Sequence, residues 1–308
     1  HIYGQLFIYM NKCRDNKGRP YPGCDNNRSG IFFMNTVSPA ITGVDSHAHI
    51  FRQDLPMVAN RRYSPDYDAL VEQYLEHLDR FGLSHGVLIQ PSFLGTDNHF
   101  MVAALQRFPE RLRGVAVVDA AITDAQLDEL AAAGVVGIRL NLIGKDLRDY
   151  TGPAWIGLFE RLAGRGWQIE IQRGIDDLAQ VVPAIVATGV TVVIDHFGLP
   201  TGGIDAHKPE HRAFLQLLED SRVWLKLSAA YRSQSDLPQA SAVLAQVREA
   251  AGGIERFVWG SDWPNTQFED RTDYAQQLEL IESLLPEAAE RAQVLVANPA
   301  RLFGFTTR

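Results

Sequence analysis

From residue 41 onward, short apolar runs alternate with longer segments in which apolar residues recur three and four positions apart. The short runs predict β-strands, and the longer segments predict amphipathic helices that cover a sheet. The eight predicted strands cover residues 41–47, 84–91, 112–119, 135–141, 167–172, 191–196, 222–228 and 256–262. Eight strand–helix units at this spacing favour an α/β fold in which the strands close into a (β/α)8 barrel, which typically needs about 250 residues.

A doubly wound open sheet is the main competing fold. Such a sheet would carry a glycine-rich phosphate-binding turn after its first strand. This chain has His47-Ala48-His49 at that position, which favours the barrel. We therefore expect one domain over residues 34–308, with a final helical extension at 286–297, followed by NPARLFGF, that closes or covers the barrel.

Residues 1–33 differ in character from the rest of the chain. Residues 11–30 are rich in Asn, Arg, Lys, Gly and Pro and show no helix or strand period. We interpret residues 1–33 as a tail outside the domain, either upstream sequence or a segment added in cloning. Cys13 and Cys24 lie there, where pairing or metal binding with other chains is the alternative to an incidental role. The predicted domain has no cysteine, which excludes thiol catalysis within it.

Net charge and hydropathy limit which classes of partner and which cellular location we expect for this protein. The net charge of −8 and the lack of a basic stripe argue against a non-specific nucleic-acid binder, which needs a basic surface. No apolar run approaches the roughly 18 residues of a membrane span, and the first residues lack the order of a secretory signal. We expect a cytoplasmic protein that acts on a small molecule, with the oligomeric state left open.

Polar side chains gather at the predicted carboxyl ends of the strands, where barrels of this type place their active sites. His47 and His49 share one face of the first strand because strand side chains alternate with a period of two. His196 ends the sixth strand and Asp262 ends the eighth. We expect the remaining histidines to be solvated surface residues: His77, His85, His99, His207 and His211.

This set of residues fits two kinds of chemistry. Asp262 can act as a general base toward water while the histidines polarise a carbonyl group. Alternatively, two histidines and an aspartate can hold a single zinc ion that activates the water. Arg139, in the fourth strand, either binds a substrate carboxylate at the barrel mouth or pairs with a buried acid. Loop residues that could add donors are Tyr63, Lys145, Arg148, Tyr150 and Arg232.

Seven motifs occur in order along nearly the whole predicted domain: GVDSHAHIF, RRYSP, QPSFLGTDN, LRGVAVVD, GIRLN, VVIDHFGLP and FVWGSDWPN. In these motifs the chain resembles the amidohydrolase superfamily, and within it the 2-pyrone-4,6-dicarboxylate hydrolase-like lactonases. The resemblance implies a (β/α)8 barrel in which Asp262 activates water for lactone hydrolysis. It also implies that His47, His49 and His196 polarise the lactone carbonyl.

The same resemblance implies which residues hold the carboxylates of the substrate, namely Arg139, Lys145, Tyr63, Ser92 and Arg232. The chain departs from the family pattern after the sixth strand, where the dicarboxylate hydrolases have an arginine before proline. Here Leu199 precedes Pro200. The expected substrate is therefore 2-pyrone-4,6-dicarboxylate or a related carboxylated lactone.

The resemblance also bears on a metal. Many metal-dependent members of the superfamily carry a histidine or a lysine near the ends of the fourth and fifth strands. Those strands read GIRLN and WQIEIQ here, so a binuclear site is not expected. We favour a metal-independent lactonase. One alternative is a mononuclear zinc hydrolase or decarboxylase that uses His47, His49 and Asp262, with His196 or Glu170 as an optional further ligand. The other is a catalytically silent barrel used for binding.

Overall fold

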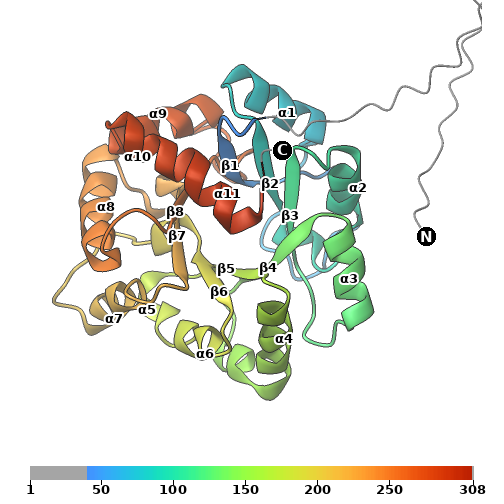
Figure 1. Cartoon of the computed structure of the whole chain (residues 1–308), viewed down its shortest axis with the longest axis horizontal. Coiled ribbons are helices and arrows are strands. Elements are labelled where there is room, and N and C mark those ends of the chain that lie inside the picture. Colours follow the sequence, from blue (N-terminus) through green and yellow to red (C-terminus); the bar gives the residue numbers. More distant parts are fainter. Residues whose placement is uncertain (1–39, 307–308) are drawn as a thin grey trace, which may run out of the picture. The chain divides into compact units, whose positions relative to one another are not determined.

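The computed structural model describes residues 40–306 of the chain. The predicted tail at residues 1–33, with Cys13 and Cys24, lies outside the described residues, as do residues 34–39 of the predicted domain. Within the described part, strands and helices alternate around a central sheet (Figure 1).

Eight parallel strands form one sheet in the order of the sequence. The strands are β1 (Val44–Ala48), β2 (His85–Ile89), β3 (Leu112–Ala116), β4 (Val135–Asn141), β5 (Gln168–Gln172), β6 (Thr191–Ile194), β7 (Val223–Ser228) and β8 (Phe257–Gly260). All eight predicted strands are present, and the predicted (β/α)8 barrel is confirmed. Most strand residues are buried because the strands lie between the barrel interior and a surrounding layer of helices.

The barrel is completed just beyond the end of β8. The backbone N–H of Asp262 donates to the carbonyl of His47 at 2.8 Å, and that of His49 donates to the carbonyl of Trp263 at 2.7 Å. Ala48 and Trp263 thereby form a parallel bridge between the first and last strands. Closure therefore fixes Asp262 directly beside His47 and His49.

Helices fill the connections around the outside of the barrel (Figure 1). They are α1 (Val71–Arg80), α2 (His99–Arg107), α3 (Asp124–Ala132), α4 (Pro153–Gly164), α5 (Ile175–Leu178), α6 (Val182–Val186), α7 (Pro209–Leu217), α8 (Leu237–Ala251) and α9 (Tyr274–Leu284). α1 buries Val71, Tyr74, Leu75 and Leu78, the three-and-four spacing that predicts such a helix. Asp236 caps α8 by accepting from the backbone N–H of Gln239, while the Gln239 side chain accepts from the backbone of Asp236.

The last helices lie at the amino end of the barrel, opposite the predicted site. They are α10 (Ala288–Ala292), a π-helical turn at Gln293–Ala297, and α11 (Asn298–Phe303). Phe303 and Phe305 pack against Val44, Val87 and Val115 of the barrel. The Asn298 side chain donates to the carbonyls of Ile254 and Phe257, at 2.7 Å each. The expectation that the C-terminal segment covers the barrel is confirmed.

Two histidines that were expected on the surface are buried. His85 lies in β2, 1% exposed, with its ring 4.6 Å from that of Phe305. His211 is 2% exposed and contacts Asp176 at 3.1 Å through Nε2. Both expectations were wrong because each ring is covered by a segment distant in the sequence. Within residues 40–306, no helix combines the length and apolar character that a membrane crossing requires.

Candidate active site

The carboxyl end of β1 supplies two histidines that are positioned by a buried aspartate. Asp45 is fully buried and accepts hydrogen bonds from the N–H of His47, the N–H and hydroxyl of Ser261, and the hydroxyl of Tyr274. Burial raises the pKa of Asp45 to about 6, against the effect of these hydrogen bonds. Asp45 thus joins β1 to the segment after β8 and sets the spacing between the histidines and Asp262.

Asp262 lies two residues beyond the end of β8 and has a left-handed backbone conformation, with φ of 58°. This conformation is costly for a residue other than glycine and tends to occur at functional sites. His196, just after β6, is also left-handed, with φ of 55°, and its Nδ1 lies 2.9 Å from the hydroxyl oxygen of Ser228. Both side chains are buried.

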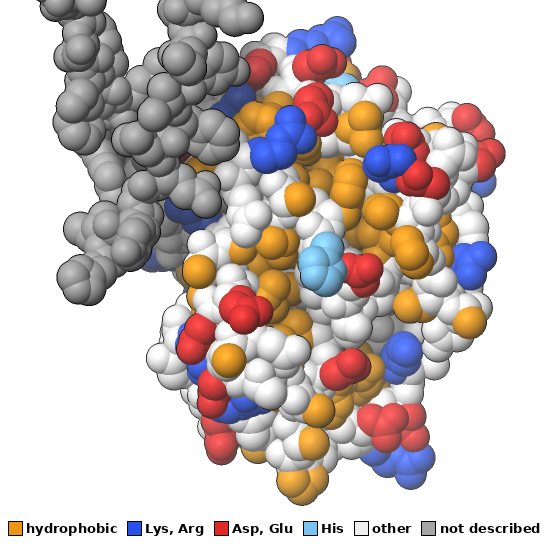
Figure 2. Space-filling view, turned by 90° about the vertical axis from the view of Figure 1, so that its right-hand side faces the viewer, with side chains coloured by type: hydrophobic (Ala, Val, Ile, Leu, Met, Phe, Trp, Pro, Cys, Tyr) orange, Lys and Arg blue, Asp and Glu red, His pale blue; other side chains and the backbone are white. Residues whose placement is uncertain are grey.

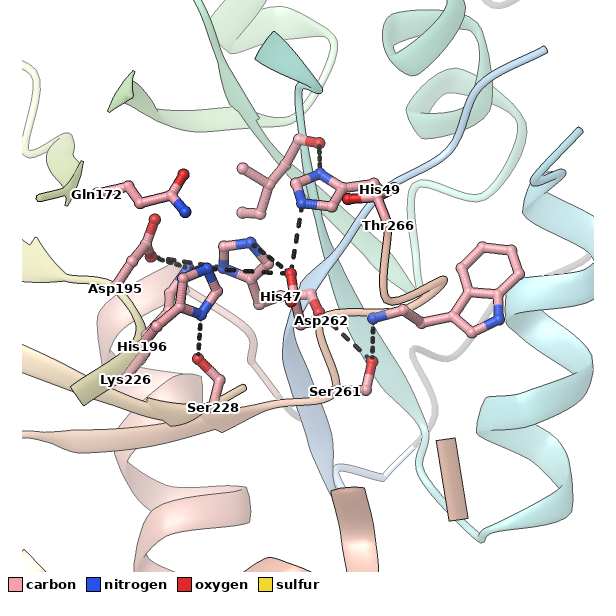
Figure 3. A network of polar contacts seen from close by, with 12 residues as sticks. His47, His49, Gln172, Asp195, His196, Lys226, Ser228, Ser261, Asp262 and Thr266 are labelled. Carbon is pink, nitrogen blue, oxygen red and sulfur yellow. Dashed lines mark hydrogen bonds and ion pairs between the residues drawn. The ribbon is translucent and has the colours of Figure 1, made fainter. Parts of the chain in front are cut away.

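The three histidines converge on one oxygen of Asp262 (Figure 3). The Oδ1 atom lies 3.6 Å from Nε2 of His47, 3.6 Å from Nε2 of His49 and 4.0 Å from Nε2 of His196. Among the described residues, Oδ1 of Asp262 and Nε2 of His47 and His196 are buried atoms without a hydrogen-bond partner. Buried polar atoms are rarely left in this state, so their convergence marks a place for a reacting group.

The second oxygen of Asp262 is held by cationic and hydroxyl donors. Arg232 donates to Oδ2 through Nε at 2.6 Å, and the hydroxyl of Tyr231 donates to the same atom. Burial alone would raise the pKa of Asp262, but the charge of Arg232 and the neighbouring histidines bring it well below the usual range. Asp262 is therefore a carboxylate at neutral pH, with one oxygen anchored and the other free.

The histidines are neutral at neutral pH because burial lowers the pKa of each ring. For His196 the pKa falls to about 4. The Nδ1 of His49 lies 2.8 Å from the carbonyl oxygen of Ile89. A carbonyl can only accept, so Nδ1 of His49 carries the proton and its Nε2 offers a lone pair toward Asp262.

A cluster of buried charges lies behind His47, on the side away from Asp262. Arg139 donates through Nε to Oδ2 of Asp195 at 3.0 Å and through Nη2 to the Gln172 side chain at 2.8 Å. Lys226 donates to Oε2 of Glu170 at 2.6 Å. Asp195 directly precedes His196, and sequence reasoning assigned it no role. Its position could have suggested a role, because Asp195 follows the last residue of β6 and directly precedes His196, a predicted site residue.

A pocket opens from Asp262 toward the solvent. It is lined by His49, Arg62, Tyr63, Pro91, Ser92, Phe93, Arg139, Asn141, Gln172, His196, Arg232, Asp262, Thr266 and Gln267. The predicted residues Tyr63, Ser92, Arg139 and Arg232 are thus brought together. Lys145 is exposed and is not among the described residues that line this pocket. Arg62, which sequence reasoning did not single out, lines it instead, since its loop carries no periodic pattern.

Three guanidinium groups therefore face one small pocket. The pKa of Arg62 is lowered by burial and by the charges of Arg139 and Arg232, which shows how close these groups are. Arg139 is 4% exposed, with its Nε and one Nη2 hydrogen used by Asp195 and Gln172. Arg139 therefore pairs with a buried acid, as one sequence prediction had it, and also lines the pocket; that it binds a substrate carboxylate stays a prediction.

A larger cavity, about 720 Å³, lies on another face of the molecule, where α2 and α3 provide much of its lining (Figure 2). Its walls carry apolar side chains such as Val102, Ile122 and Leu130, with Asp119 and Glu129 at the edges. Neither Asp262 nor any of the three histidines that converge on it is among the described residues that line this cavity. The chemistry is therefore assigned to the smaller pocket at the strand ends.

Two groups of described side chains have ligand atoms close enough to hold a metal ion. His47, His49 and Asp262 form one, and His47, Asp195 and His196 form the other, with the ligand atoms of each within 4.8 Å of one another. Glu170, an optional ligand in the sequence prediction, belongs to neither group and binds Lys226 instead. The surroundings oppose a cation, since Arg232 already binds Asp262 and Lys226 faces His47. The ligand atoms therefore have the right spacing for one metal ion, but the positive charges of Arg232 and Lys226 next to them disfavour its binding.

Comparison with known proteins agrees with this geometry. The amidohydrolase family model matches residues 44–305. A 2-pyrone-4,6-dicarboxylate hydrolase of Comamonas testosteroni is 33% identical over 276 residues, covering 84% of this chain and 89% of the relative. A 4-sulfomuconolactone hydrolase of Rhizobium radiobacter is 30% identical over 270 residues, covering 84% and 89%.

Among solved structures, a probable 2-pyrone-4,6-dicarboxylic acid hydrolase of Acinetobacter baumannii with citric acid bound superposes with a TM-score of 0.81. It is 37% identical and covers 85% of this chain and 99% of its own. The likeness extends over the whole barrel and includes the strand ends that carry the pocket. The chain therefore belongs to the amidohydrolase family.

Proposed function

We propose that this protein hydrolyses a small lactone that carries two anionic groups, using water activated by Asp262. The observation that carries the proposal is the free Oδ1 of Asp262, surrounded by three neutral histidines at the base of a pocket with three arginines. The names of the two curated relatives, a pyrone dicarboxylate hydrolase and a sulfomuconolactone hydrolase, support a doubly anionic lactone.

In the proposed reaction, the nucleophilic water lies between Asp262 and His49. Oδ1 of Asp262 and Nε2 of His49 are 3.6 Å apart, and both are acceptors. One water can donate to both, which turns its lone pair toward the substrate. As the water oxygen attacks the lactone carbonyl carbon, its proton passes to Asp262. The protonated Asp262 then returns this proton to the ring oxygen as the ester bond breaks.

The carbonyl oxygen gains negative charge in this step and needs hydrogen-bond donors. Nε2 of His47 and Nε2 of His196 lie 3.6 Å and 4.0 Å from Oδ1 of Asp262 and have no hydrogen-bond partner among the described residues. His196 lines the pocket, and His47 lies behind that lining. Each can donate to the oxyanion when its ring proton is on Nε2. In this proposal His49 binds the water, whereas the family resemblance implies that it polarises the carbonyl; the lone pair on its Nε2 supports the role toward water.

Arg139, Arg62 and Arg232 supply the charge for the two anionic groups of the substrate, with the side chains of Tyr63 and Ser92 as neutral donors. Arg139 lies deepest, and Arg62 lies at the exposed rim. The role of Lys145 stays a prediction from the family resemblance.

A mononuclear zinc-dependent amidohydrolase is the second candidate function. The spacing of His47, His49 and Asp262 favours it, since their ligand atoms lie within 4.8 Å of one another. In that case the metal would supply the activation of water. The positive charge of Arg232 and Lys226 around these ligands weighs against it.

A panel of mono- and dicarboxylated lactones, together with carboxylated amides and phosphoesters of similar size, tests the proposed function. We expect ring opening of dicarboxylated lactones, followed by ultraviolet absorbance or by proton release. Monocarboxylated lactones should show a higher KM because one guanidinium group loses its partner. Turnover of the amides or phosphoesters without any lactone turnover would contradict the proposal.

The pH dependence of kcat/KM should reveal the contact between Arg232 and Asp262. A base with a depressed pKa stays deprotonated as the pH falls until the pH reaches that pKa. In the wild type, kcat/KM should therefore fall on the acid side of the pH profile only well below pH 3.8, where Asp262 takes up a proton; we call this fall the acid limb. Titration of Asp262 should leave kcat/KM constant between about pH 5 and 8. Arg232→Met removes the charge that lowers this pKa most, so the acid limb should move upward by about one to three pH units.

Arg62→Met provides the matched control for this measurement. It also removes a guanidinium group from the pocket, but Arg62 hydrogen-bonds Asn141 rather than Asp262. Its acid limb should coincide with that of the wild type even though KM rises. If the acid limb of the Arg232→Met profile lies at the same pH as that of the wild type, Arg232 does not determine the pKa of the base.

A further inference from the structure

The ring of His47 lies between two polar environments. Its Nε2 faces Oδ1 of Asp262, while its Nδ1 faces the buried charge cluster behind it (Figure 3). His47 is 0% exposed, as are Lys226, Glu170 and Asp195. The proton of a neutral imidazole sits on one of the two nitrogens, and the partner of Nδ1 decides which. The function of Nε2 therefore depends on a residue that never contacts the substrate.

Two side chains, those of Lys226 and Asp195, lie close enough to hydrogen-bond Nδ1 of His47. Each of these hydrogen bonds requires a different tautomer of the ring. The Nζ of Lys226 lies 3.1 Å away, and Oδ1 of Asp195 lies 3.5 Å away. An ammonium group only donates, so contact with Lys226 requires a lone pair on Nδ1. A carboxylate only accepts, so contact with Asp195 would require a proton there.

The geometry favours Lys226. Its Nζ is the nearer partner, and it is held in place by Oε2 of Glu170 at 2.6 Å. Oδ1 of Asp195, in turn, lies 3.5 Å from the same Nζ, while Oδ2 of Asp195 is bound by Arg139 at 3.0 Å. The ammonium thus has two hydrogen-bond acceptors, Oε2 of Glu170 and Nδ1 of His47, and forms an ion pair with Oδ1 of Asp195, an atom without a hydrogen-bond partner among the described residues.

We propose that Lys226 is a positioning residue that fixes His47 as the Nε2–H tautomer, so that His47 presents a hydrogen-bond donor, not a metal-binding lone pair, to the reaction centre. The inference deepens the proposed function and rests on it for the role of the donor. A histidine that binds a metal through Nε2 normally donates its Nδ1–H to a carboxylate, carbonyl or water. His49 meets this condition through the carbonyl of Ile89, and His47 does not.

The two neighbouring histidines therefore have opposite tautomers. His49 offers a lone pair, which accepts from water, and His47 offers an N–H, which donates to the carbonyl oxygen. This division supplies both the water-binding group and the oxyanion donor of a hydrolysis from two residues at the carboxyl end of β1. It also explains why a buried lysine, a rare residue in a protein interior, lies in the barrel.

The tautomer can be measured directly by nitrogen-15 NMR of histidine-labelled protein, with the His47 signals assigned by their loss in His47→Asn. In the wild type, we expect Nδ1 at the chemical shift of an unprotonated nitrogen and Nε2 at that of a protonated one. The opposite pattern in the wild type would overturn the proposal without any need for a lysine variant.

The double variant Lys226→Met with Glu170→Gln removes one buried positive and one buried negative charge and leaves the Arg139–Asp195 pair. In it, Nδ1–H of His47 should turn to Oδ1 of Asp195 and the NMR pattern should reverse. We expect kcat to fall about 10²-fold, the usual effect of losing one oxyanion donor. KM should change far less, since the arginines of the pocket are untouched.

Glu170→Gln alone is the matched control, because it keeps Lys226 and should keep the wild-type tautomer. Titration of zinc into the metal-free proteins, followed by calorimetry, gives a readout that does not depend on activity. The double variant should bind zinc about 10- to 100-fold more tightly than the wild type and the control. An unreversed tautomer, or equal zinc affinity in all three proteins, would overturn the role of Lys226.

These experiments test the proposed function and the role of Lys226 separately. If no lactone is turned over but the tautomer pattern is as expected, the proposed function fails and the assignment of Lys226 stands. If lactones are hydrolysed and His47 carries its proton on Nδ1, the function stands and the assignment of Lys226 fails.

Discussion

Replacement of Asp262 by asparagine is expected to lower kcat about 10²- to 10⁴-fold, the usual contribution of a general base. The amide has nearly the same size as the carboxylate and can still accept a hydrogen bond from Arg232, but it cannot take a proton from water. Because Asp262 is 0% exposed and its backbone joins β8 to β1, the asparagine variant is preferable to a truncation. Steady-state kinetics on a dicarboxylated lactone measures the effect.

Asp119→Asn serves as the control for this variant. Asp119 also follows a barrel strand, but it lies at the exposed edge of the larger cavity near α2 and α3. Its kcat should match the wild type. Circular dichroism and thermal unfolding should show that both variants fold. Undiminished turnover by Asp262→Asn would remove Asp262 as the base.

The second large effect is expected from Arg139. Arg139→Met should raise KM for a dicarboxylated lactone about 10- to 100-fold, because a charged hydrogen bond to the substrate contributes roughly 1.5–3 kcal/mol. It should also lower the free energy of unfolding by about 3 kcal/mol, since Asp195 loses its closest cationic partner in a buried site. Kinetics and denaturant unfolding measure the two effects on the same protein.

Arg139→Lys separates these two roles. Lysine keeps the charge near Asp195 but loses the planar fork that binds a carboxylate through two parallel hydrogen bonds. We expect most of the stability to return while KM stays raised. If Arg139→Met changes stability alone and leaves KM as in the wild type, Arg139 is a purely structural partner of Asp195.

The barrel could be predicted from the sequence because each strand is a continuous buried run and each helix has a three-and-four apolar spacing. The predicted ends were less accurate. The last strand was predicted to reach residue 262 but ends at Gly260, since Asp262 turns into the left-handed region. This turn is what aims the carboxylate at the histidines. It depends on Asp45 and His47, which lie more than 200 residues earlier, so no local pattern could show it.

The convergence of His47, His49, His196 and Asp262 could also be foreseen, because the carboxyl ends of barrel strands meet at one face. The buried charges behind them could not. Lys226 and Glu170 lie at strand positions where a charge is unexpected, but only the fold shows that they bind each other and that Lys226 reaches His47. Family resemblance pointed to Lys145, whereas the structure brings Arg62 to the pocket, because loop conformation decides which cation reaches it.

In the proposed mechanism, Asp262 and the histidines open a lactone without a metal. The most direct test is the kcat of protein purified under chelation and shown by elemental analysis to hold no metal, measured on a dicarboxylated lactone with chelator present. We expect the same kcat as that of untreated protein and no increase on addition of zinc. Loss of turnover in the metal-free protein, with recovery on addition of one equivalent of zinc, would contradict it.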